Sequence, residues 1–243
     1  MNPIAVAVSV VLLLASTVLV LRIARIPVAA SAVIAVARGA GQLAIVSVLL
    51  GLALTVWWAG AVVLLVMVGT AIITASSRLR EFPSATGPVA LAILSGVTVT
   101  LGIVFGTGAF DFDARYVLAF SGIVIGGSMT TASTTGRQLW IGMVHRSDEI
   151  EGWLALGATP RQSVADISRA AVVEALRPSI DQTRTTGLVT LPGAFVGALL
   201  AGASPVDAGI FQVTVLAGLL AAGSLSSTMT AYLLGAPKQL PAR

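Results

Sequence analysis

GAGQLAIVSVLLGLALTVWWAGAVVLLVMVGTAIITASS, from Gly39 to Ser77, contains no Asp, Glu, Lys, Arg or His. A helix needs roughly 20 mostly apolar residues to cross about 30 Å of bilayer hydrocarbon. The run is too long for one crossing and suits two. Trp57 and Trp58 lie near its middle, and tryptophan favours the interface between membrane and water. We therefore predict membrane-spanning helices over 33–54 and 57–76, with a turn around residues 55–58.

The composition of the whole chain supports the same class. Hydrophobic residues make up 56% of the 243 residues and charged residues only 10%, whereas a soluble domain has about 25% charged residues. The arginines lie between the apolar runs, where they suit contact with lipid headgroups better than binding of nucleic acid. Cysteine is absent, which excludes a disulfide framework and thiolate metal sites.

Charged residues separate five further apolar runs, at 4–21, 88–106, 116–136, 185–203 and 208–234. The first begins Met-Asn-Pro without a basic segment before it, so we interpret it as a retained span and not a signal peptide. The sequence therefore predicts an all-α, polytopic membrane protein of about seven transmembrane helices, with residues 1–243 forming one permease domain.

The basic residues predict the orientation. With the N-terminus outside and the C-terminus in the cytoplasm, Arg115 is the one basic residue of the external loops. The cytoplasmic segments then hold the others, including six arginines between Arg137 and Arg184. The opposite orientation would contradict the preference of Lys and Arg for cytoplasmic loops. We expect a multi-pass protein of the inner or plasma membrane.

The polar segment 137–184, between the fifth and sixth predicted spans, contains signals for two short cytoplasmic helices. Gly157 suits the left-handed position after a helix end. Thr159, Pro160 and Gln162 match the start of a second helix, with Thr159 and Gln162 as a capping box. Apolar residues recur at helical spacing after it, at Val164, Ile167, Ala171 and Val172. A rigid elbow with an apolar ridge suits docking into a soluble partner.

Glu151, followed by Gly157 and Ala158, resembles the EAA motif of ABC transporter permeases. The resemblance implies a coupling helix that enters a groove on a separate ATP-binding subunit, with these contact residues: Glu151, Leu154, Leu156, Gly157 and Ala158. The chain has no Gly-x4-Gly-Lys-Ser/Thr loop of its own, so ATP would be bound by that partner and no cofactor by this chain.

Further segments are similar to FetB-type permeases, bacterial iron exporters with plant relatives in aluminium tolerance. They are Arg146–Pro160, Gly187–Gly193 and, in order along the chain, Arg38 with Gln42 and Leu43, Gly126–Met129, and Phe211 with Gln212. The resemblance implies a homodimeric permease that exports metal ions. The chain departs from the family pattern at Gly127, Thr130, Ala194 and Phe195, which removes possible metal contacts, so the metal-binding residues stay unknown.

Several residues are candidates for the translocation pathway. Arg38 and Gln42 lie four residues apart on one face of the second predicted span, and Arg38 either faces a pathway or extends to the interface. Ser128, Met129 and Thr130 either pack helices together or line a pore. Gln212 joins the set through the family resemblance.

Pro192 and Gly193 interrupt the sixth predicted span, where they form either a structural kink or a hinge for alternating access. The main alternative function is a secondary transporter or channel without ATP coupling. An intramembrane enzyme would need paired Asp residues or a Ser/His pair at membrane depth, and the predicted spans contain neither Asp nor His. We expect a transporter subunit, not an enzyme.

Overall fold

A computed structural model describes residues 2–53 and 58–236. Over these residues the chain is helical, apart from connecting loops and one isolated bridge between Thr186 and Thr190. The all-α expectation is confirmed. The chain divides into two compact units, 1–59 and 60–243, each of which is considered by itself.

The first unit is a hairpin of α1 (Pro3–Ile23) and α2 (Ala29–Ala53), which pack against each other. Asn2 caps α1, because its side-chain oxygen accepts a hydrogen bond from the backbone N–H of Ile4 at 3.0 Å. Both helices match predicted spans. Of the turn predicted around residues 55–58, residues 55–57 lie outside the described residues.

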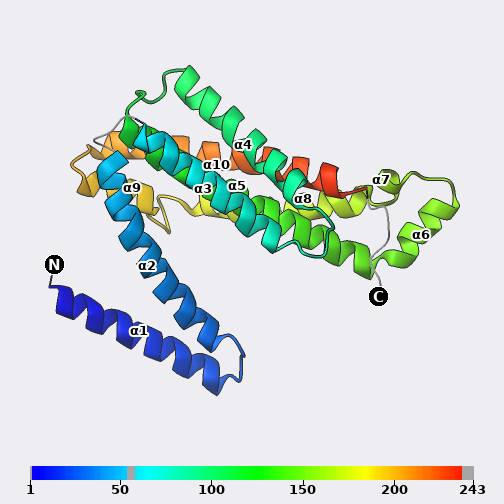
Figure 1. The fold of residues 1–243 in the computed structure, drawn as a ribbon, viewed down its shortest axis with the longest axis horizontal. Coiled ribbons are helices and arrows are strands. Elements are labelled where there is room, and N and C mark those ends of the chain that lie inside the picture. The colour runs from blue at the N-terminus through cyan, green and yellow to red at the C-terminus, as the bar shows by residue number, and fades with distance from the viewer. Residues whose placement is uncertain (1, 54–57, 237–243) are drawn as a thin grey trace. The chain divides into compact units, whose positions relative to one another are not determined.

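The second unit is a bundle of long helices with short helices at its two ends (Figure 1). The long helices are α3 (Ala59–Ser77), α4 (Thr86–Gly106), α5 (Ala114–His145), α8 (Ala165–Thr185) and α10 (Pro205–Leu234). The short helices are α6 (Ser147–Ala155), α7 (Pro160–Ser163) and α9 (Gly193–Leu200). α10 packs against α4, α5 and α8, and α5 also packs against α4 and α8.

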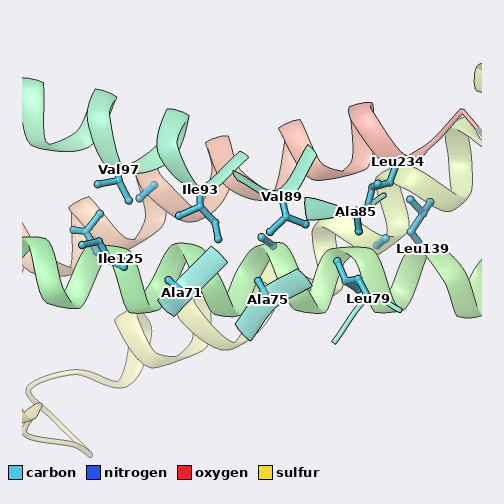
Figure 2. Close-up of a cluster of buried hydrophobic side chains, with 14 of the residues drawn as sticks. Ala71, Ala75, Leu79, Ala85, Val89, Ile93, Val97, Ile125, Leu139 and Leu234 are labelled. Carbon is cyan, nitrogen blue, oxygen red and sulfur yellow. The ribbon is translucent and has the colours of Figure 1, made fainter. Parts of the chain in front are cut away.

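The core of this unit lies between α4, α5 and α10. Figure 2 shows Val89, Ile93 and Val97 of α4 pointing toward α5, and all three are buried. Small residues bring the helices together: a Cβ added to Gly96 would lie 2.6 Å from the carbonyl oxygen of Ala222 on α10. Helices in membranes gain little from hydrophobicity and depend on such close contact.

α5 and α10 run in the same direction. Near their starts, Phe110 and Tyr116 lie against Phe211, with ring centroids 5.1 and 6.0 Å away. At the other end, the Arg161 guanidinium of α7 lies 3.6 Å from the ring centroid of Tyr232, close to the end of α10. We call these the α9 end and the α7 end of the bundle. The chain between α5 and α10 must therefore return from the α7 end to the α9 end.

Six helices are long and apolar enough to cross a membrane among the residues that the structure describes: α1, α2, α3, α4, α5 and α10. The prediction of a continuous sixth span over 185–203 is wrong. α8 ends at Thr185, an irregular segment follows, and α9 has only 8 residues. Gly187, with φ of 88°, turns the chain there, and Pro192 stops any earlier helix from continuing into α9.

Candidate functional site

The predicted elbow is formed by α6 and α7, and its turn is built as the sequence indicates. The N–H of Ala158 donates to the carbonyl of Trp153 at 3.0 Å, and the N–H of Gly157 donates to that of Leu154 at 3.0 Å. This pair of bonds is a Schellman motif, which needs a left-handed residue. Gly157 supplies it with φ of 90°. Thr159 and Gln162 form the predicted capping box at the start of α7.

An ion pair fixes the other side of the elbow. Arg146 follows the end of α5 and donates to both carboxylate oxygens of Glu149, at 2.7 and 2.6 Å. The hydrogen bond from Arg146 is the main reason why the pKa of the Glu149 carboxyl lies below its usual value. Both side chains are well exposed, so the pair orients α6 more than it stabilises the fold.

Large apolar side chains are exposed at the end of α6, on this elbow. Leu156 is 82% exposed and Trp153 is 50% exposed. Both line a groove of about 530 Å³ between α6 and the α7–α8 segment, together with Gly157 and Ala158. Of the other predicted coupling residues, Glu151 is exposed and Leu154 packs against the core. The elbow therefore presents an apolar tip on a rigid support.

The predicted apolar ridge after the elbow is not free to bind a partner. Val164, Ile167 and Ala171 are buried in the core of the second unit. A Cβ added to Gly142 of α5 would meet Ile167 directly, so this ridge seats α8 on α5. The expectation that the ridge contacts a partner is wrong, because the protein's own α5 covers it.

The polar residues of α5 occupy different environments. Ser128 is fully buried, and its hydroxyl has no hydrogen-bond partner among the described residues. Met129 packs against the hydrophobic core. Thr130 is exposed, and its hydroxyl donates to the carbonyl of Gly126 at 3.0 Å. These three side chains do not gather on one surface, and a pathway role for them stays a prediction.

Arg38 and Gln42 both lie exposed on α2, in the first unit. They share one face of the helix, as their spacing indicates. Whether they meet a pathway or the interface stays a prediction.

Gln212 performs a local structural task. Its side chain is 4% exposed, and its Oε1 accepts a hydrogen bond from the backbone N–H of Phe195 at 3.2 Å. Phe195 lies in the first turn of α9, where backbone N–H groups lack partners within the helix. Gln212 thus holds the start of α9 against α10. Pro192 and Gly193 are not inside a long helix as predicted: Pro192 is the N-cap residue of α9, and Gly193 begins it.

Replacing Gln212 with Leu is expected to release α9 from α10. The N–H of Phe195 loses its partner, and an unsatisfied buried polar group costs about 1–3 kcal/mol. Thermal unfolding of the detergent-purified protein should show a fall in Tm of several degrees. Thr214→Val serves as the control, because Thr214 bonds only to its own helix, at the carbonyl of Ile210. Equal Tm values for the two variants would contradict this role of Gln212.

Sequence reasoning missed the charged stripe of α8. Three ion pairs recur along the exposed face of this helix, each with a spacing of three residues: Asp166–Arg169, Glu174–Arg177 and Asp181–Arg184. The signal was present, because the pairs repeat every seven or eight residues and so share one helix face.

Within the described ranges, no group of three or more His, Cys, Asp or Glu side chains could hold a metal ion.

The helices and their composition define an all-α, multi-pass membrane protein. The chain belongs to the family described as "Uncharacterised protein family (UPF0014)", which matches residues 3–237.

Among similar proteins is "UPF0014 membrane protein STAR2" of Oryza sativa subsp. japonica, 38% identical over 169 residues, or 70% of this chain and 59% of the relative. "Protein ALUMINUM SENSITIVE 3" of Arabidopsis thaliana is 36% identical over 70% of this chain and 62% of its own length. "Probable iron export permease protein FetB" of Escherichia coli is 34% identical over 59% of this chain and 55% of its own length. The matches thus cover less than two thirds of these relatives. No solved structure matches the chain.

Proposed function

We propose that this chain is the membrane-spanning permease subunit of an ABC transporter, driven by a separate ATPase subunit. The observation that carries the proposal is the α6–α7 elbow, whose exposed tip is Leu156. An exposed leucine on a short helix fixed at both ends suits insertion into an apolar groove of a partner. The groove beside Leu156 and Trp153 would accept a side chain from that partner in return.

The assembly follows from this role. Two copies of the permease would act with two ATPase subunits, which bind and hydrolyse the ATP. The EAA-like residues Glu151 to Ala158 would transmit closure of the ATPase pair to α5 and α8, to which the elbow is joined through Arg146 and Val164. We place the protein in the inner or plasma membrane, with the N-terminus outside and the C-terminus in the cytoplasm.

The proposed cargo is a metal ion, with iron first because a relative is named a probable iron export permease. Export is proposed on the same basis. Comparing the iron content of cells with and without this chain tests the cargo separately from the ATP coupling. A secondary transporter or channel is the alternative, and it would move its solute without any ATPase.

Replacing Leu156 with Glu is expected to weaken ATPase binding at least tenfold. The change places a charge at the centre of the apolar contact, and central contact residues contribute about 2 kcal/mol or more to binding. Co-purification of the tagged permease with the ATPase, followed by titration in detergent, measures the affinity. Ile141→Glu is the control, because Ile141 is also exposed but lies on α5, outside the elbow. Unchanged affinity for the Leu156 variant would refute docking through this tip.

A further inference from the structure

We propose that α8 crosses the membrane as a charged helix and that its ion-paired face lines a water-filled path for a hydrated ionic solute. The water-filled path deepens the permease role proposed above and rests on it. The position of α8 in the membrane does not depend on that role. The proposal depends on three observations: the direction of the neighbouring helices, the depth of α8 beside them, and the exposure of its charges.

The direction of α5 and α10 requires a crossing between them. Both helices are long and apolar enough to span the membrane, and both run from the α9 end to the α7 end of the bundle (Figure 1). The chain that joins them must return across the membrane once. α8 is the long helix of that connection, and it packs along both α5 and α10.

The contacts of α8 give its depth. Leu79 lies between Arg78 and Arg80, which favour the cytoplasmic interface, and a Cβ added to Gly136 of α5 would meet Leu79 at 2.6 Å. Gly136 therefore lies at the level of the cytoplasmic interface. Farther along α8, Leu176 lies beside Gly223 of α10, 3.3 Å from a Cβ added there. Thr131 of α5 lies beside the same glycine, 3.2 Å from that Cβ, so Leu176 and Thr131 are at one level. At about 1.5 Å per residue, Thr131 lies about 7 Å inside the membrane from Gly136.

The same rise places the last ion pair near the centre of the bilayer. α8 continues as one helix to Thr185. Asp181 and Arg184 are therefore about 8 and 12 Å beyond Leu176, and thus about 15–19 Å from the interface, in hydrocarbon that is about 30 Å thick. The whole stretch from Asp181 to Thr186, DQTRTT, is polar.

The charges at this depth are not covered by the other helices of the second unit. Arg184 is 75% exposed and Asp181 is 59% exposed, with 3.5 Å between Nη1 and Oδ1. A single charged residue facing lipid at the bilayer centre costs about 2.5–3.5 kcal/mol on insertion scales. Such residues normally face water or protein and mark ion and substrate pathways. The three ion pairs give the stripe equal numbers of positive and negative charges, so it suits a solute that keeps its water.

Thiol accessibility tests the path without an ATPase or a known solute. The chain has no cysteine, so single cysteines can be placed without a background. Gln182→Cys puts a thiol between Asp181 and Arg184 and leaves the ion pair intact. Val99→Cys is the matched control, because Val99 is exposed on α4. Its neighbour Thr100 lies beside Gly218 of α10, 3.4 Å from a Cβ added there, at nearly the same depth as Gln182.

We expect a charged, membrane-impermeant methanethiosulfonate to modify Gln182→Cys in membrane vesicles at least tenfold faster than Val99→Cys. Modification of both cysteines after denaturation in SDS confirms that each thiol is present. Equally slow modification of the two cysteines in the folded protein would overturn the proposal. This holds also if the modification is slow because a second copy of the chain covers this face. Fast modification in a protein that binds no ATPase would keep the path and reject the proposed ATP coupling.

Reagent charge tests whether Asp181 faces the same water. In the Gln182→Cys background, Asp181→Asn should lower the ratio of modification rates by cationic and anionic reagents several-fold, since the nearby negative charge is lost. A role of Asp181 in packing alone would leave that ratio unchanged, and an unchanged ratio would overturn the assignment of this residue to the path.

Discussion

Gly157→Val is expected to leave the protein inserted in the membrane but to abolish stimulation of the partner ATPase by the transported solute. Gly157 has a φ of 90°, and a Cβ added there would have no neighbour within 4 Å. The cost comes from the backbone: a left-handed conformation costs a residue with a Cβ about 1–2 kcal/mol, and a β-branched residue is a stronger outlier.

That cost falls on the two hydrogen bonds that close the elbow. If residue 157 leaves the left-handed region, the N–H of residue 158 no longer reaches the carbonyl of Trp153, and the Schellman pair is broken. α6 would then lose its fixed angle to α7. A docked but loosely joined helix cannot transmit motion, so basal ATPase activity should persist without solute stimulation.

The measurement is the ATPase rate of the complex reconstituted in liposomes, with and without solute. Gly157→Asn is the matched variant, because asparagine tolerates the left-handed region, and it should retain most of the stimulation. Full stimulation in the Val variant would rule out coupling through this turn.

Gly96→Leu should destabilise the bundle more than any surface change. A Cβ at position 96 would lie 2.6 Å from the carbonyl oxygen of Ala222 and would also meet the Ser226 hydroxyl. The first of these is backbone, which cannot move aside by changing a rotamer. Overpacking of this kind costs about 1–3 kcal/mol or more, and here it forces α4 away from α10.

Thermal unfolding in detergent should show a fall in Tm of about 2–12 °C, since 1 kcal/mol corresponds to about 2–4 °C for a chain of this size. Gly102→Leu is the control on the same helix, because a Cβ there has no neighbour within 4 Å. A Tm for Gly96→Leu equal to that of the control would mean that α4 and α10 do not meet as described.

The elbow could be predicted closely from the sequence because its determinants are local. Gly157, Thr159 and Gln162 act through hydrogen bonds to residues at most five positions away, so residue order alone specifies them. The exposure of Leu156 could not be predicted, because it depends on the packing that buries Ile150 of the same helix in the core and leaves the tip outside.

The predicted sixth span shows the opposite case. Hydropathy placed it at 185–203, because that run lacks charge. The structure instead packs the charged α8 against α5 and α10, where Ile167, Ala171 and Ala175 form a narrow buried face. A hydropathy average counts the charges on the other face equally and so rejects the helix.

The sequence by itself determined the class of protein, the other six spans and the turn between α6 and α7, because apolar runs of sufficient length and local capping need no distant partner. Tertiary structure alone decided which face of each helix is buried and that Gln212 holds the start of α9. Those outcomes depend on which helices meet and at what depth, and contacts between residues far apart in the chain fix both.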